Sequence, residues 1–295
     1  MADQSLFRPT LRLEHYAPYI VAYYFKQWDG FHMDYHVHNA AEIMYVIQGS
    51  GRVETEDAAV ELRKGDFILL DAGVTHRLIV QKDRPCRMLN IEFVFREKAG
   101  AMPSIRDLAE GHEELSAFLS NKRPFVVLSD PSDVYHTLKN VVWELDQYGD
   151  QRSGMVQLQM SQLFIRIARL AAQADRENMQ ADSYVEKAVA FMHQHYDCDI
   201  QVKDMASAVN VHPGYLHRIF KQKTGRTLIE YLAAFRMEKA KMLLSQTDIS
   251  ITQIPDYIGL NSSQYFSTVF KKYTGTTPAE YRKSQESWRR DISES

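Results

Sequence analysis

The sequence has little cysteine, no long apolar run and no apolar leader. Only two cysteines occur among 295 residues, Cys86 and Cys198. Two distant thiols argue against a disulfide framework and a thiolate metal site, so both are expected to be buried as small apolar side chains. No segment approaches the roughly 18 consecutive apolar residues that span a bilayer, and the first residues lack the apolar core of a secretory signal. We therefore expect a cytoplasmic protein without a membrane partner.

Neither sign of charge dominates the chain, whose formal net charge is −3. Residues 181–295 contain 15 Lys and Arg against 13 Asp and Glu, whereas residues 1–180 contain 20 against 25. This mild asymmetry permits a nucleic-acid-binding C-terminal half but does not demand one. At roughly 100–200 residues per domain, the length predicts two domains.

Residues 1–100 have the pattern of a β domain. Short apolar or alternating runs recur, with glycine-containing turns between them. Many short strands at this spacing predict a sandwich or barrel. The runs are Glu42–Gln48, Phe67–Leu70, Arg77–Val80 and Met88–Phe95.

Residues 101–175 change to a helical period. Apolar residues recur there at alternating spacings of three and four, which is a heptad-like seam. The seam is either a helix packed on its own barrel or a dimer interface, and a second apolar surface on the same helix favours the dimer. Residues 176–183 are polar and are the expected linker. The seam consists of Met160, Leu163, Ile167, Leu170 and Ala174.

Residues 184–284 contain an internal repeat, followed by a tail at 285–295. Tyr215–Lys221 aligns with Tyr265–Lys271 at an offset of 50 residues, and the match continues through glycine and threonine positions. Each copy has two apolar helical stripes separated by a residue suited to positive φ, Asn210 or Gly259. The repeat therefore predicts two helix-turn-helix units joined by a long helix at Leu228–Leu244.

The second helix of each unit has an outward polar face. A plain helical bundle with duplicated hairpins would explain the repeat, but small and hydrogen-bonding residues ending in a cation favour contact with a DNA major groove. A long joining helix can hold the two units about 34 Å apart, one DNA turn. The predicted DNA-binding residues are Gly214, His217, Arg218 and Lys221 in the first unit, and Ser263, Gln264, Ser267, Thr268 and Lys271 in the second.

This segment resembles the DNA-binding domain of the AraC/XylS family over about 100 residues. The family signature is matched by Ile251–Ile254, Ile258-Gly259-Leu260, Tyr265-Phe266, Phe270–Lys272, Gly275, Thr277-Pro278 and Tyr281-Arg282. The resemblance implies base contacts from all of these residues except Lys221 and Lys271. The implied set is Gly214, His217 and Arg218 in the first unit and Ser263, Gln264, Ser267 and Thr268 in the second. It also implies double-stranded DNA and RNA polymerase as partners, with a homodimer on paired half-sites. Pro255 replaces the usual alanine and is expected to start its helix. Thr268 replaces a common arginine, which predicts weaker contacts from the second unit.

A second motif lies in the N-terminal domain and resembles the two cupin motifs. The first is complete, as Gly30, His36, His38, Glu42 and Gly49. The second comprises Gly65, Asp71, Gly73 and His76, with Asp71 in place of proline and Val80 in place of asparagine. The resemblance implies a jelly-roll barrel. The fold class is therefore α+β in two domains: a cupin-like barrel with a helical dimerisation segment, then an all-α double helix-turn-helix.

The cupin residues have three interpretations: a metal site, a metal-free effector pocket or a purely structural role. His36 and His38 point to the same side of a strand, and Glu42 and His76 can join them. Three imidazoles and a carboxylate can hold Mn, Fe, Co, Ni or Zn as divalent ions. The same set can instead bind a polar effector without metal, so no cofactor is required. The aromatic residues Tyr24, Trp28 and Tyr45 are expected to stack on the effector or to belong to the core.

The leading hypothesis is a non-enzymatic transcription regulator, an activator, whose effector by family resemblance is a carbohydrate. The first alternative is a metal-dependent cupin enzyme, which the histidine set supports and the DNA-binding module opposes. The second is a regulator that senses the metal itself.

Overall fold

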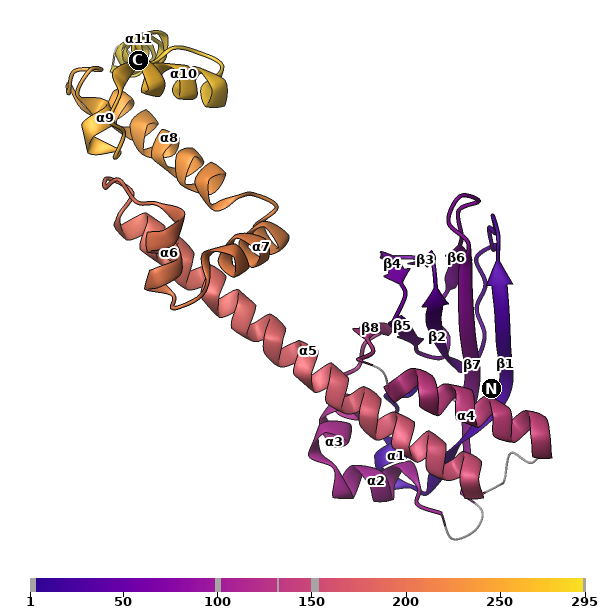
Figure 1. Cartoon of the computed structure of the whole chain (residues 1–295). Helices are drawn as coiled ribbons and strands as arrows, with labels where there is room; N and C mark the ends of the chain where they lie inside the picture. Colours follow the sequence, from indigo (N-terminus) through magenta and orange to yellow (C-terminus); the bar gives the residue numbers. More distant parts are fainter. Residues whose placement is uncertain (1–3, 99–101, 132, 150–153, 294–295) are drawn as a thin grey trace. The chain divides into compact units, whose positions relative to one another are not determined.

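The computed structural model describes residues 4–98, 102–131, 133–149 and 154–293. The chain divides into two compact units, Met1–Arg176 and Glu177–Ser295. The first is rich in sheet and the second is helical (Figure 1), which confirms the expected two-domain α+β class. None of the described helices is long and apolar enough to cross a membrane.

Two antiparallel sheets form the first unit. The larger has the strand order β1 (Tyr16–Trp28), β7 (Cys86–Glu97), β2 (Ala41–Gln48), β5 (Asp66–Leu70) and β8 (Phe125–Ser129). The smaller has the order β4 (Ala59–Arg63), β3 (Ser50–Thr55) and β6 (His76–Ile79).

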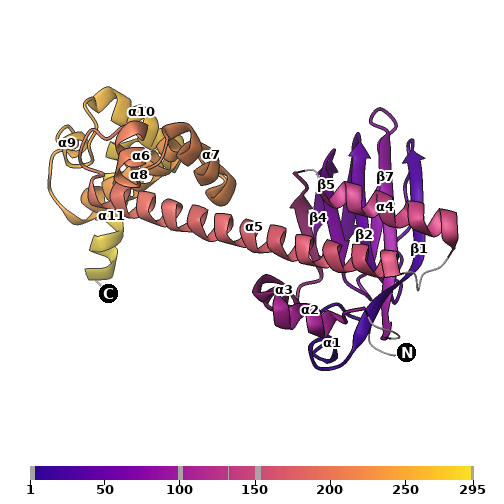
Figure 2. The same cartoon turned by 60° about the horizontal axis from the view of Figure 1, so that its bottom comes forward.

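The larger sheet buries both faces, so its central strands alternate between two cores. On β2, Met44 and Val46 belong to the core shared with the smaller sheet. Ile43 and Tyr45 belong to a core on the opposite face. That face is covered by helices, as Figures 1 and 2 show. The helices are α1 (Thr10–Leu13), α2 (Ile105–Gly111), α3 (Glu113–Ser120), α4 (Asp133–Tyr148) and the first part of α5 (Gly154–Gln194).

Most residues of the heptad-like seam are buried inside the first unit. Met160, Leu163 and Ile167 are at most 1% exposed and lie in the core beneath the larger sheet. Leu170 and Ala174 are partly buried against the same core. The seam therefore packs on its own domain, because a helix covering a sheet needs the same apolar spacing as a helix facing a partner.

Other local expectations also differ from the structure. Strand β8 interrupts the segment 101–175 that was expected to be helical, and it pairs with β5. The expected linker at 176–183 lies inside α5, because alanine, glutamate and glutamine favour helix even without an apolar stripe. Cys86 is buried as expected, but Cys198 is exposed. The expected tail continues the last helix as far as Ser293.

The second unit repeats one helical pattern twice. Its further helices are α6 (Val202–Ala208), α7 (Pro213–Thr224), α8 (Leu228–Gln246), α9 (Ile254–Tyr257), α10 (Ser263–Thr274) and α11 (Pro278–Ser293). We call α6 with α7 the first module and α9 with α10 the second module. Asn210 and Gly259 take the expected positive φ, at 56° and 70°. Pro255 lies in the first turn of α9, as expected, and this helix has only four residues.

Candidate functional site

A pocket of about 340 Å³ opens between the two sheets of the first unit. Strands β1, β2 and β7 supply one wall, and β6 and the segment preceding β2 supply the rest. The structure brings His36, His38, Glu42 and His76 together in this pocket, as the motif spacing predicted. The other lining residues are Tyr24, Lys26, Trp28, Met33, Met44, Leu78, Asn90 and Glu92.

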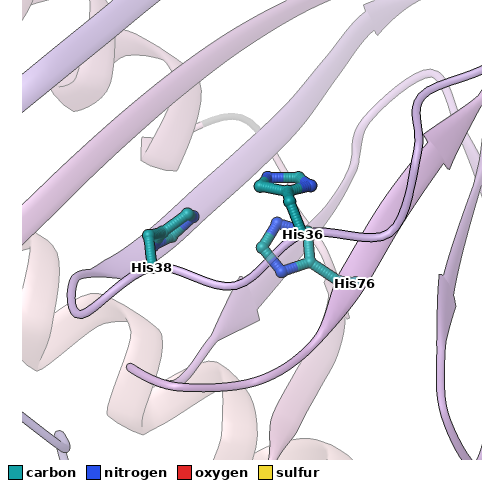
Figure 3. A group of neighbouring side chains, drawn as sticks. All are labelled: His36, His38 and His76. Atoms are coloured by element: carbon teal, nitrogen blue, oxygen red, sulfur yellow. The ribbon is translucent and has the colours of Figure 1, made fainter.

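The three imidazoles form a compact group (Figure 3). The ring centroid of His76 lies 4.4 Å from that of His36 and 5.2 Å from that of His38. A pair of backbone hydrogen bonds joins His36 to His76, so the two chain segments are aligned edge to edge. The ligand nitrogens of the three rings lie within 4.8 Å of one another.

Glu42 is the charged centre of this group. One carboxylate oxygen, Oε2, lies 3.3 Å from Nε2 of His38 and 3.2 Å from Nε2 of His76. The other, Oε1, accepts a 2.9 Å hydrogen bond from Asn90. Burial alone would raise the pKa of Glu42, but the hydrogen bonds from His38 and His76 hold it at about 2. The same bond to Glu42 raises the pKa of His38. Glu42 is therefore an ionised carboxylate over the whole physiological pH range.

Each imidazole is oriented by a backbone carbonyl at its Nδ1 atom. The partners are the carbonyl oxygens of residues 34, 40 and 74, at 3.4 Å from His36, 3.0 Å from His38 and 2.8 Å from His76. A carbonyl at Nδ1 accepts the Nδ1–H, so Nε2 can bind a metal once its own proton, which bonds to Glu42 in His38 and His76, has been released. The separations between Glu42 Oε2 and two Nε2 atoms also suit neighbouring ligands at bond lengths near 2.1 Å. The donor set therefore fits a divalent transition metal as well as a polar molecule.

Two of the three aromatic residues predicted for the effector site line the pocket, and the third lies in the core on the opposite face of the sheet. Tyr24 and Trp28 line the pocket. Tyr45 does not, because it lies an odd number of residues from Glu42 and so faces the opposite side of β2. There its hydroxyl donates to Asp130 at 3.1 Å, and burial beside Asp130 raises the pKa of Tyr45. Tyr45 is thus a core residue and was wrongly assigned to the effector site.

Sequence reasoning missed three polar residues of the pocket: Lys26, Asn90 and Glu92. Asn90 pairs across the sheet with both Tyr24 and Met44. Glu92 lies two residues further along β7, opposite Glu42. Period-2 alternation along β7 would have placed Asn90 and Glu92 on one face. The register that brings them beside Glu42 depends on strand pairing between residues that are about 50 positions apart.

Asp71, the departure from the second cupin motif, connects the pocket loop to the start of the chain. Its carboxylate accepts hydrogen bonds from Ser5 Oγ at 2.6 Å and from the Leu6 amide at 2.7 Å. Leu6 itself is fully buried. Two residues beyond Asp71, the Gly73 amide donates to the carbonyl of His38. The loop between β5 and β6 therefore touches both the N-terminal segment and the histidine group.

The outward face of α7 matches the predicted first DNA-binding surface. Leu216, Ile219 and Phe220 are buried, which leaves the opposite side of the helix to solvent. The side chain of Arg218 lies over the ring of Tyr215, at 5.3 Å from its centroid. The exposed residues on this side include Gly214, His217, Arg218 and Lys221.

The outward face of α10 is equally accessible but offers fewer free donors. The hydroxyls of Ser263, Ser267 and Thr268 each donate to a backbone carbonyl, at 3.0–3.2 Å. Gln264 and Lys271 are exposed and carry longer polar side chains. Ser262 caps the helix by accepting from the amide of Tyr265. Hydroxyls that are already donating can still accept hydrogen bonds from base amino groups.

Two family models match the chain. The AraC-like ligand-binding domain covers residues 18–184, and a helix-turn-helix domain covers residues 205–284. The chain is 23% identical to the Msm operon regulatory protein of Streptococcus mutans, over 82% of this chain and 83% of that protein. It is 26% identical to the raffinose operon transcriptional regulatory protein RafR of Pediococcus pentosaceus, over 84% and 86%. Among solved structures, the C-terminal domain of the response regulator AraT of Geobacillus stearothermophilus matches 34% of this chain and 84% of its own length, at 37% identity and a TM-score of 0.34.

Proposed function

Because the chain belongs to the AraC-type transcriptional regulators that carry an AraC-like ligand-binding domain, we propose that it activates transcription in response to a carbohydrate. The effector occupies the pocket of the first unit, and the outward faces of α7 and α10 bind double-stranded DNA. Such a regulator works in the cytoplasm together with RNA polymerase. Two relatives whose names refer to the Msm and raffinose operons support a sugar-related role.

The observation that carries the effector proposal is the chemistry of the pocket lining. Glu42, Asn90 and Glu92 offer carboxylate and amide groups, while Tyr24 and Trp28 offer aromatic surface. A sugar presents hydroxyls that donate to carboxylates and C–H faces that pack on aromatic rings. The volume of about 340 Å³ lies at the lower end of the range for small-ligand sites, so it suits a small carbohydrate.

We assign the homodimer contact to the solvent side of α4 and α5. Trp143, Tyr148, Met155 and Leu158 are each at least 50% exposed there. Large apolar side chains gathered on two helices of one domain favour burial against another apolar surface. A two-fold symmetric contact brings the same patch from both copies together and presents four helix-turn-helix modules to paired half-sites on DNA.

A thermal-shift screen of the full chain with mono- and disaccharides tests the effector. A sugar present at 100 times its dissociation constant should stabilise the chain by about 2.7 kcal/mol. His36→Ala and Glu42→Ala should abolish that shift while basal DNA binding remains. His136→Ala is the matched control, since this histidine is exposed and outside the pocket. Loss of basal DNA binding in both pocket variants would argue against a separate sensor.

A metal-sensing regulator is the second candidate, and the carbonyl-anchored Nδ1 atoms favour it. His36, His38, His76 and Glu42 would hold the ion, whose positive charge would reorganise the pocket when bound. The test is a titration with Mn, Fe, Co, Ni or Zn salts, with binding of a DNA duplex as the readout. Metal-dependent DNA binding without any sugar would support this candidate. A sugar response that persists in excess chelator would exclude it.

A further inference from the structure

Arg236 is a buried charge in the middle of the helix that joins the two DNA-binding modules. It lies on α8 and is only 8% exposed. Burial lowers its pKa, and no carboxylate among the described residues lies within ion-pair distance of it. A buried cation is costly unless its donors are paired. The position therefore has a specific structural role beyond filling the core.

The guanidinium group of Arg236 binds the loop that leads into the first module. Its Nε donates to the carbonyl of Tyr196 at 2.8 Å, and its Nη2 donates to the carbonyl of Cys198 at 2.6 Å. Both residues lie between the end of α5 and the start of α6. The planar fork of arginine matches two fixed acceptors, so it sets both the distance and the orientation of this loop.

The second module contacts the same loop through Gly259. Gly259 forms the turn after α9 with a φ of 70°. A Cβ atom placed there would lie 2.6 Å from the carbonyl oxygen of Tyr196 and 2.7 Å from Nη2 of Arg236. Only glycine allows this approach, since both the backbone conformation and the lack of space exclude a side chain. Arg236, Gly259 and the carbonyl of Tyr196 therefore meet at one closely packed point.

The connection between the modules consists of α8, which contributes to both apolar cores, and of this contact. The two modules have separate apolar cores, and the ring of Tyr196 packs against both. A pocket of about 310 Å³ lies beside Arg236 and Gly259, between α8 and the start of α10. Tyr273 on α10 adds one longer hydrogen bond of 3.3 Å to the carbonyl of Glu230. Figure 1 shows α8 running between the helices of the two modules.

We propose that Arg236 and Gly259 clamp the entry loop and thereby fix the distance and rotation between α7 and α10. The clamp makes Arg236 a positioning residue for DNA binding, without touching DNA. It determines which spacing between two DNA segments the chain accepts. One added base pair moves the segments apart by about 3.4 Å and rotates them by about 34°. The inference rests on the proposed contact of both modules with DNA.

The experiment compares spacing preference in the full chain. Duplexes bound by the wild-type chain are first selected from a random-sequence pool, and versions with one inserted base pair between the two protected segments are then prepared. We expect the insertion to weaken wild-type binding by about tenfold or more, because one module loses its base contacts. Arg236→Lys keeps the charge but loses the fork, and Gly259→Ala introduces the clash.

Both clamp variants should bind the selected duplex about tenfold more weakly. Their preference for the original spacing should fall below about threefold, because the modules are no longer held in register. Leu244→Ala is the control: it removes buried core of the second module away from the clamp and should lower the melting temperature while retaining the wild-type spacing preference. The two clamp variants alter different partners of the loop, so either one decides the matter if the other does not fold.

Wild-type spacing preference in a folded clamp variant would overturn the inference and leave Arg236 as a stabilising residue only. A failure of the wild-type chain itself to select DNA would overturn the proposed function instead. In that case the wild-type chain would select no duplex sequence at all, even at low salt.

Discussion

Replacing Glu42 by glutamine removes the charge at the centre of the pocket while nearly conserving its shape. A fall in the pKa of Glu42 from 4.5 to about 2 corresponds to about 3 kcal/mol of folding free energy. Because this pKa is lower in the folded chain, the contribution is present above pH 4.5 and is lost as the pH falls toward 2. His38 has a raised pKa, so its contribution is present below pH 6.5 and is lost as the pH rises through the folded value.

The lowered pKa of Glu42 and the raised pKa of His38 both arise partly from the hydrogen bond between these two residues, so the two free energies are not additive. The bond is fully formed between about pH 4.5 and 6.5, and Glu42→Gln should have its largest effect in that window. A loss of about 3 kcal/mol lowers the melting temperature by roughly 6–12 °C for a domain of this size. Below pH 4.5 the variant and the wild type should converge as Glu42 is protonated, whereas above pH 6.5 only the part of the difference that comes from the His38 bond should be lost.

The assay is thermal unfolding of the full chain from pH 3 to 8, with chelator present and tryptophan fluorescence as the signal. Trp28 and Trp143, two of the three tryptophans, belong to the first unit. Glu61→Gln is the control, because this carboxylate is 58% exposed and pairs with Arg52 at the surface. It should change the free energy of unfolding by less than about 1 kcal/mol. A Glu42→Gln chain that keeps the wild-type pH dependence would refute the assignment of Glu42 as the charged centre.

Three further substitutions test other parts of the molecule. Arg218→Ala should weaken binding of a selected duplex by ~1–3 kcal/mol in fluorescence anisotropy, and unchanged affinity and sequence preference would remove Arg218 from the DNA contacts. Asp71→Ala should cost about 2 kcal/mol, because Ser5 and Leu6 lose their acceptor; it should also speed tryptic cleavage in the N-terminal segment, and an unaltered cleavage rate would contradict this role. Leu158→Glu should yield monomers in sedimentation while the chain stays folded, because this leucine is 50% exposed; a persisting dimer would assign the interface elsewhere.

The second unit was predictable in detail because its signals are local. Residues that align at the offset of 50 have the same local contacts in the structure. Thr227 with Glu230 and Thr277 with Glu280 form the same reciprocal hydrogen bonds at the start of α8 and α11. Such bonds join residues three apart, so the sequence order alone specifies them.

The pocket was predictable only in part, because its lining combines local and distant residues. The spacing of His36, His38 and Glu42 predicted their grouping. Lys26 enters the pocket from β1, a strand that the short apolar runs did not reveal. Strand β8 was missed for a similar reason. Its five residues resemble any short apolar run, and only pairing with β5 makes them a strand.

The hydrogen bonds from Ser5 and Leu6 to Asp71 have a practical consequence for work with the purified protein. A start codon chosen downstream of Leu6 would remove both donors to Asp71, whose loop also donates to the carbonyl of His38. Ligand measurements on such material would report a weakened sensor even with every pocket residue intact.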